Sequence, residues 1–374
     1  MSRRAAFVYS DVLSRHVLRE DHVMVPTRLR YTYELLESYG AFQRPNASLV
    51  EPRQATEEEL LTFHTQEYLN VVRSLNLGES RYNPAAYGFS EHGDNPVFSG
   101  MYEASAWSTG ASLVAAELIS KGESDVAFNC SGGLHHAMPG HASGFCIFND
   151  PVIAINYLTG QGLRVVYVDI DAHHGDGVQH AFYDSNQVLT ISLHQSGAYL
   201  FPGTGFVNEM GTNAGLGYSV NVPLYPYTND ETYLWAFNQV VPPLVRAFNP
   251  DVLATQLGMD PHFRDPITQL GLTVQGHSQV VADLGQLATR WLAFGGGGYD
   301  IAAVARGWAL DFGVMLGEEW PDEIPQEYTE WYGLKNLRDT EGPSIDQGML
   351  GQARRFAEES VEEIKRRIFP LHAV

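Results

Sequence analysis

Basic residues and cysteines are both scarce in this chain. Lysine and arginine together number 23 against 44 aspartates and glutamates, which gives a formal net charge of -21 over 374 residues. Nucleic-acid backbones bind basic surfaces, so this balance argues against a direct nucleic-acid partner and favours cationic substrates. The two cysteines, Cys130 and Cys146, are too few for a disulfide framework. We expect both to be buried, small apolar side chains in a reducing compartment.

Long apolar runs are missing too. No segment approaches the roughly 18 apolar residues of a membrane span, and the run after Arg3-Arg4 is too short for a signal peptide. The sequence therefore predicts a cytoplasmic protein with no membrane partner. Apolar residues make up 44% of the chain, enough to bury a large core. Because no repeat or long Gly/Ser linker divides it, we expect residues 1–374 to form one domain.

Short apolar runs, most of them unbroken, recur along the chain. Unbroken runs are typical of strands covered on both faces, as in a mainly parallel sheet. The predicted strands are residues 6–9, 126–130, 164–170, 188–193, 219–222, 252–257 and 291–294. The predicted helices are 28–38, 57–74, 100–121, 152–158, 230–248 and 274–290, with an amphipathic helix over about 349–368 packed on the body. Pro242-Pro243 is expected to break or kink the helix at 230–248.

A polar segment ends one predicted strand and reads Asp169-Ile-Asp-Ala-His-His-Gly-Asp176. Side chains two apart on an extended strand share a face, so Asp169, Asp171 and His173 can converge on one point. Two carboxylates and an imidazole at one point are unfavourable unless a cation is present. With one more carboxylate, the set gives a divalent ion three ligands and an open position. The alternative is that Asp176 merely caps the next helix.

Three other predicted strands end in polar, glycine-bearing loops, which gather at one edge of a parallel sheet. Asp260 directly follows the strand at 252–257 and supplies the missing carboxylate, unless it is only a turn residue beside Pro261. His135-His136 is the acid/base candidate, because the imidazole pKa lies nearest neutrality.

Two carboxylates and a phenol complete the candidate site. Asp169 and Asp176 could orient the two imidazoles by accepting their second ring N–H. Four glycines precede Tyr299, and such a run lets the backbone approach a ligand closely. The phenol would then stabilise negative charge on a carbonyl oxygen. A phosphate loop is disfavoured, because neither lysine nor Ser/Thr follows the glycines. These residues indicate metal-assisted amide hydrolysis.

With these residues assembled, the chain resembles the histone deacetylase family and its bacterial acetoin-utilization and acetylpolyamine amidohydrolase relatives. The matching segments are 22–28, 132–136, 143–146, 169–176, 201–205, 256–260 and 295–299. The resemblance implies a single-domain α/β, arginase-like fold with a central, mainly parallel sheet of about eight strands flanked by helices. It also implies one Zn²⁺ per chain, with Fe²⁺ as the alternative metal.

The resemblance further implies a role for each matching residue. Zinc would be held by Asp171, His173 and Asp260. His136 would be the general acid/base and His135 its electrostatic partner, paired with Asp176 and Asp169 respectively, and Tyr299 would be the catalytic tyrosine. Gly144, Phe145 and Phe201 would line an acyl-lysine tunnel, and Asp94 would accept substrate backbone N–H groups at its rim. A monovalent cation such as K⁺ would bind near Asp169, Asp171, His173 and Ser192.

The substrate class follows from one position in the candidate pocket. A polyamine-selective branch of the family carries a gatekeeping glutamate where this chain has Ile267. We therefore favour a zinc-dependent protein lysine deacetylase, with a metabolic enzyme as one candidate substrate. The alternatives are a deacetylase of acetylpolyamines or other small amides, a catalytically silent acyl-lysine-binding protein, and an arginase-like enzyme with two metals. Acyl-chain length depends on packing near Arg28, Cys146 and Ile267, and the oligomeric state does not follow from these residues.

Overall fold

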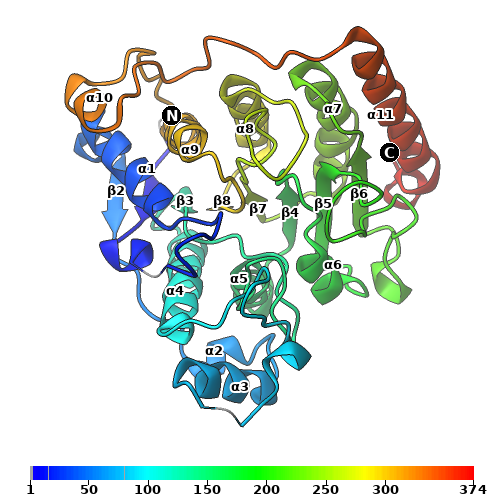
Figure 1. Ribbon diagram of the computed structural model, residues 1–374. Helices are drawn as coiled ribbons and strands as arrows, with labels where there is room; N and C mark the ends of the chain where they lie inside the picture. Colours follow the sequence, from blue (N-terminus) through cyan, green and yellow to red (C-terminus); the bar gives the residue numbers. More distant parts are fainter. Residues whose placement is uncertain (1–2, 16, 80) are drawn as a thin grey trace.

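One parallel sheet of eight strands forms the centre of the molecule in the computed structural model, which describes residues 3–15, 17–79 and 81–374 (Figure 1). The strand order is β2-β1-β3-β8-β7-β4-β5-β6, and all neighbouring pairs are parallel. The strands are β1 (Ala5–Val8), β2 (Ala47–Val50), β3 (Val126–Asn129), β4 (Val165–Asp169), β5 (Val188–Gln195), β6 (Ser219–Leu224), β7 (Val252–Gln256) and β8 (Trp291–Phe294). The expected fold class is confirmed.

Helices cover both faces of this sheet, as the unbroken apolar strands require. One layer holds α1 (Thr27–Ser38), α7 (Asp230–Phe248), α8 (Val274–Leu287), α9 (Ile301–Leu316) and α11 (Gln347–Arg367); the other holds α4 (Met101–Ser120), α5 (Asp150–Gly160) and α6 (Asp176–Phe182) (Figure 1). Short helices α2 (Glu57–Leu60) and α3 (Gln66–Asn76) lie beyond α4 and α5, and α10 (Gln326–Tyr332) lies near α1. No helix within the described residues is long and apolar enough to cross a membrane.

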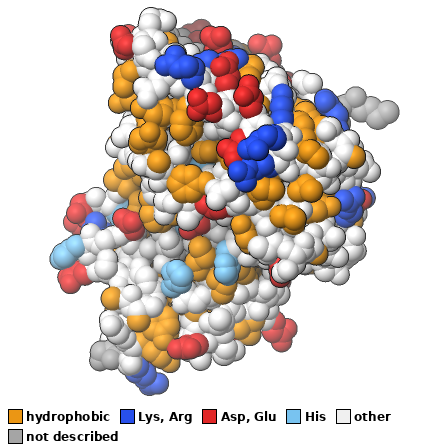
Figure 2. Space-filling model, turned by 90° about the vertical axis from the view of Figure 1, so that its right-hand side faces the viewer, with side chains coloured by type: hydrophobic (Ala, Val, Ile, Leu, Met, Phe, Trp, Pro, Cys, Tyr) orange, Lys and Arg blue, Asp and Glu red, His pale blue; other side chains and the backbone are white. Residues whose placement is uncertain are grey.

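The C-terminal helix α11 is amphipathic and packs on α7 and β6, close to its expected bounds. Its buried side is made of small and aliphatic residues, among them Ala357, Val361 and Ile364. Its outer side carries i,i+4 ion pairs such as Arg354 with Glu358. The face of the molecule on this side shows acidic and basic side chains intermixed (Figure 2). Both cysteines are buried and free, as expected.

The helix expected over 57–74 is wrong: two helices stand there, separated by a turn. His64 lies in this turn, and its Nε2 accepts the backbone N–H of Asn149 at 3.0 Å. The next residue, Thr65, donates its N–H to the carbonyl of Pro139 at 2.9 Å and caps α3 by accepting the N–H of Tyr68. These long-range hydrogen bonds outweigh the local helical pattern, which periodicity alone cannot reveal.

The expectation that the proline pair breaks α7 is wrong, and a kink at these prolines stays a prediction. The helix runs without interruption from Asp230 to Phe248, with Pro242 among its buried residues. Burial of the apolar face outweighs the loss of two backbone donors. The sequence also misses edge strand β2, whose side chains are half-buried or exposed and lack the unbroken apolar pattern.

The turn at His64 generates a prediction about stability and pH. Burial lowers the pKa of this imidazole to about 4, whereas an unfolded chain titrates near 6.5. Between these values only the unfolded state takes up the proton, so the stabilisation is complete above pH 6.5 and is lost as the pH falls toward 4. The loss is about 1.4 kcal/mol per pH unit within this window.

We therefore expect His64→Gln to flatten the pH dependence of the free energy of unfolding between pH 6.5 and 4 by that amount. Urea unfolding of both proteins at several pH values measures the difference in slope. The difference isolates His64 from all groups that the two proteins share. Parallel curves would mean that the pKa of the His64 imidazole is the same in the folded and the unfolded protein.

Candidate active site

The four central strands of the sheet end in one row. Asn129 of β3 pairs with Phe294 of β8, Phe294 with Gln256 of β7, and Gln256 with Asp169 of β4. The loops that follow these four residues therefore leave the sheet side by side. They carry all but two of the side chains that the sequence singles out for catalysis and metal binding. Asp169 is the last residue of β4, and Asp176 begins α6. The topology brings together segments more than 160 residues apart along the chain.

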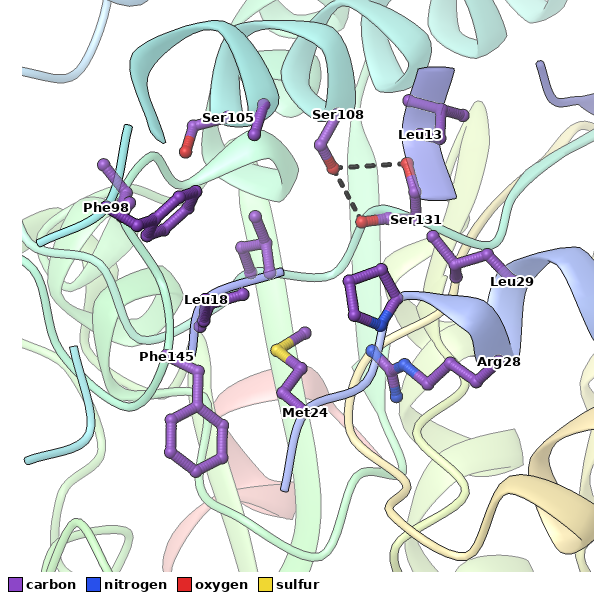
Figure 3. A pocket seen from close by; sticks show the side chains of 14 residues that line it. Leu13, Leu18, Met24, Arg28, Leu29, Phe98, Ser105, Ser108, Ser131 and Phe145 are labelled. Carbon is purple, nitrogen blue, oxygen red and sulfur yellow. Dashed lines mark hydrogen bonds between the residues drawn. The ribbon is translucent and has the colours of Figure 1, made fainter. Parts of the chain in front are cut away.

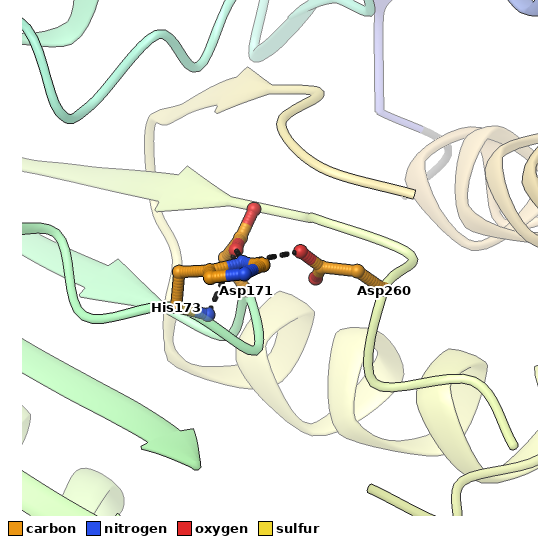
Figure 4. Close-up of side chains that lie close together, drawn as sticks. All are labelled: Asp171, His173 and Asp260. Atoms are coloured by element: carbon orange, nitrogen blue, oxygen red, sulfur yellow. Dashed lines mark hydrogen bonds and ion pairs between the residues drawn. The ribbon is translucent and has the colours of Figure 1, made fainter. Parts of the chain in front are cut away.

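Asp171, His173 and Asp260 converge beyond this row, with ligand atoms all within 4.8 Å of one another (Figure 4). His173 Nδ1 lies 2.8 Å from Asp260 Oδ2 and 3.2 Å from Asp171 Oδ1. Both carboxylates are fully buried. Each keeps its second oxygen on a backbone N–H: Asp260 Oδ1 accepts from Ala172 and Asp171 Oδ2 from Gly297.

The charges of this cluster suit a divalent cation. Burial and the charge of Asp171 raise the pKa of Asp260 to about 8. Burial lowers the pKa of His173, but the two carboxylates outweigh it and raise that pKa to about 10. With protein groups alone, a proton on the imidazole balances the carboxylates. A divalent ion can replace that proton and accept the same three lone pairs, a mixed O/N set that zinc favours.

His135 and His136 form two carboxylate–imidazole pairs that meet at their ring nitrogens. His135 Nδ1 lies 2.8 Å from Asp169 Oδ2, and His136 Nδ1 lies 2.7 Å from Asp176 Oδ1. The two Nε2 atoms are 3.0 Å apart, within hydrogen-bond distance of each other. Asp176 is not the N-cap of α6; Gly175 holds that position and Asp176 begins the helix. Its carboxylate accepts from His136, which removes the capping alternative.

The two imidazoles have opposite pKa shifts. Burial lowers the pKa of His135, but the charges of Asp169 and Asp171 outweigh this and raise it to about 9. Burial and the neighbouring His135 lower the pKa of His136 to about 4. Near neutral pH the proton therefore lies on His135, and His136 stays a neutral base. This division is suited to proton transfer in both directions.

An open cavity of 350 Å³ leads to these groups. Its lining includes Asp94, His136, Gly144, Phe145, His173, Phe201, Ile267 and Tyr299. Tyr299 packs edge-on against Phe145 with ring centroids 5.6 Å apart. A Cβ added at Gly144 would lie 2.4 Å from the ring of His136 and 2.9 Å from that of Phe201, so glycine is required for this narrow approach.

A mainly apolar cavity of 90 Å³, called the inner cavity below, adjoins the small chamber beside the metal cluster (Figure 3). Met24 and Phe145 line both it and the small chamber beside the metal cluster. Arg28 faces the inner cavity and donates to the carbonyl of Gly298 at 2.8 Å. The shape of this cavity thus depends on Arg28, which the sequence connects with acyl-chain length.

Sequence reasoning missed the residues that hold the loop of the imidazole pair. Asp150 is fully buried and accepts the N–H groups of Gly133 and Leu134. Asn149 Nδ2 donates to the carbonyls of His135 and Ala137. The available signal was Asn149-Asp150-Pro151, a helix start on the segment that follows the histidine pair. Ser192 lies beside Asp169 on β5 and bonds His194, and the cation site there stays a prediction.

Comparison with known proteins gives one consistent family. Residues 22–315 match the histone deacetylase domain. The acetoin utilization protein AcuC of Bacillus subtilis is 40% identical over 334 residues, covering 87% of this chain and 86% of that protein. Human histone deacetylase 1 is 36% identical over 98% of this chain and 74% of its own length. The crystal structure of a histone deacetylase homologue from Aquifex aeolicus is 30% identical, covers 97% of this chain and 100% of that one, and superimposes with a TM-score of 0.87.

The cluster in Figure 4 generates a prediction about metal content. Asp260→Asn removes one negative ligand, and we expect zinc affinity to fall by more than about tenfold. Zinc competition with a chromophoric chelator, supported by elemental analysis, measures this. Asp230→Asn is the matched control, because that carboxylate binds Thr273 rather than the cluster. Equal zinc affinity in the Asp260 variant and the wild type would remove Asp260 from the metal site.

Proposed function

This chain belongs to the histone deacetylase family, and from that premise we propose that it removes acetyl groups from Nε-acetyl-lysine side chains of proteins. The family places it among the hydrolases of acetyl amides. The observation that carries the proposal is the convergence of Asp171, His173 and Asp260 with the His135–His136 pair at the inner end of one open cavity. The products are acetate and lysine.

Zinc held by Asp171, His173 and Asp260 would polarise the acetyl carbonyl and lower the pKa of a water molecule toward about 7. His136, neutral near pH 7, accepts a proton from that water through Nε2. Its Nδ1–H donates a hydrogen bond to Asp176, which keeps the imidazole ring in one orientation. The same proton passes to the lysine nitrogen as the C–N bond breaks. His135, positively charged and paired with Asp169, stabilises the negative charge that develops nearby.

Tyr299 has the remaining role, as hydrogen-bond donor to the carbonyl oxygen when it becomes negative. Burial raises its pKa well above the usual range, so the phenol keeps its proton at neutral pH. Its ring packs edge-on against Phe145 and lines the small chamber beside the metal cluster, where the acetyl group would lie in this proposal. A monovalent cation such as K⁺ near Asp169, Asp171, His173 and Ser192 belongs to the same proposal, as does action in the cytoplasm.

The mouth of the cavity favours a protein substrate. Asp94 is exposed and lines the open cavity, and in this proposal its carboxylate accepts backbone N–H groups of an extended substrate chain. Phe201 is 43% exposed and, with Phe145, offers aromatic faces to the four methylenes of lysine. Ile267 supplies an apolar wall at the position where the polyamine-selective branch of the family carries a gatekeeping glutamate. A metabolic enzyme is the candidate substrate, following the acetoin-utilization relative.

Two alternatives, an arginase-like enzyme with two metals and a silent acyl-lysine-binding protein, fit the site less well. An arginase-like reaction needs two metals, and the described residues contain one group of three candidate ligands. A silent binding protein would not need the paired imidazoles with opposite pKa shifts.

Substrate preference is tested by comparing an acetyl-lysine peptide with acetylspermidine on the zinc-loaded protein. We expect kcat/KM to favour the peptide by at least about tenfold, because the peptide adds rim contacts and the polyamine lacks a carboxylate partner at Ile267. Ile267→Glu is the informative variant. It should shift the ratio toward acetylspermidine by supplying that partner. A wild-type preference for the polyamine would overturn the protein-substrate proposal.

The role of Tyr299 is tested by Tyr299→Phe. Loss of one oxyanion donor is expected to lower kcat by about 10² to 10³, while zinc content and KM change little. Steady-state kinetics and elemental analysis measure both. A variant with unchanged kcat would exclude the phenol from catalysis.

A further inference from the structure

The loop that carries Tyr299 has little rigidity of its own. It begins with four glycines, and Gly296 and Gly298 have φ values of 118° and 122°, a region that other residues rarely adopt. Glycine backbones of this kind explore many conformations unless external contacts restrain them. The position of the phenol must therefore come from groups outside the loop.

Three side chains from distant segments provide those restraints on three successive residues. Asp171 accepts the N–H of Gly297 at 2.7 Å, and Arg28 donates to the carbonyl of Gly298 at 2.8 Å. The N–H of Tyr299 itself donates to Asp265 Oδ2 at 2.9 Å. Two of the three belong to the metal cluster and the inner cavity, which leaves Asp265 without an assigned role.

Asp265 also binds the backbone of Ile267, which lines the same open cavity as Tyr299. Its other oxygen, Oδ1, accepts the N–H of Ile267 at 3.0 Å. Ile267 and Tyr299 both line the open cavity, so one carboxylate joins two of its walls. Asp265 is 8% exposed, and these two backbone groups are its side chain's hydrogen-bond donors within the described residues. A buried carboxylate bound to two N–H groups is a strong, directional restraint.

We infer that Asp265 is a positioning residue that fixes Tyr299 for catalysis by bonding its backbone and that of Ile267 at once. The inference rests on the proposed function, because it assigns the phenol of Tyr299 to the developing oxyanion. Asp265 touches no reacting atom and acts through the tyrosine. A shift of about 1 Å in such a donor is enough to reduce turnover on the order of 100-fold. Because Asp265 binds both residues, a displacement of Ile267 would also displace Tyr299.

Asp265→Asn tests this, because an amide has one acceptor oxygen and places its NH₂ against the second N–H. Either orientation of the amide loses one of the two bonds, so we expect kcat to fall on the order of 10- to 100-fold, with zinc content unchanged and KM within about threefold. Asp265→Ala loses both bonds and should fall further. Asp230→Asn is the matched control, because Asp230 binds Thr273 in the following segment without contacting Tyr299.

A double-mutant cycle separates positioning from general destabilisation. In a Tyr299→Phe background the hydroxyl is already gone, so Asp265→Asn should lower kcat by less than about threefold. An equal loss in both backgrounds, wild-type activity of Asp265→Asn, or a similar loss in Asp230→Asn would each overturn the inference.

The proposed function can fail separately. If the zinc-loaded wild type hydrolyses neither acetyl-lysine peptide nor acetylspermidine, the hydrolase proposal falls. The positioning is then decided by crystal structures of the wild type and Asp265→Asn. A displaced or disordered Tyr299 ring in the variant supports it, and an unchanged ring overturns it.

Discussion

The burial of two carboxylates around one imidazole is the constraint on which the rest of this structure depends. Asp171 and Asp260 have no exposed surface, and both point at His173. Such a cluster is unstable unless a proton or cation balances it and each remaining oxygen has a donor. The backbone of Ala172 and Gly297 supplies those donors. The hydrogen bonds of this cluster therefore hold the loops after β4, β7 and β8 together.

The parallel sheet makes this possible by ending its central strands in register. Because the ends of these four strands are adjacent, the loops that follow them lie side by side at one edge of the sheet. Polar groups from four separate segments therefore meet there. The surrounding helices exclude water, which strengthens each charge pair and separates the pKa values of His135 and His136. The burial that stabilises the sheet is thus also the burial that shifts the pKa values of the imidazole pair.

The sequence predicts the parallel sheet well because its strands are covered on both faces, as the burial of β4 and β7 confirms. It predicts which side chains meet because ligands that directly follow strands need no knowledge of loop geometry. It fails where distant partners decide the outcome. The turn at His64 depends on Asn149, 85 residues away, and the partner of Asp265 is the N–H of Tyr299. Backbone groups are the same in every residue, so the sequence does not identify which one an aspartate will bind.

Asn149 connects the outlying helices to the chemistry. Its N–H binds His64 in the turn between α2 and α3, and its amide holds the carbonyls of His135 and Ala137. The small helical unit is therefore linked by hydrogen bonds through Asn149 to the loop of the imidazole pair, although it lies far from the sheet (Figure 1), and we expect the two to open together. Local opening of that unit would release one end of the loop bearing the general base, so amide-exchange protection of α3 and the lifetime of the competent site should rise and fall together.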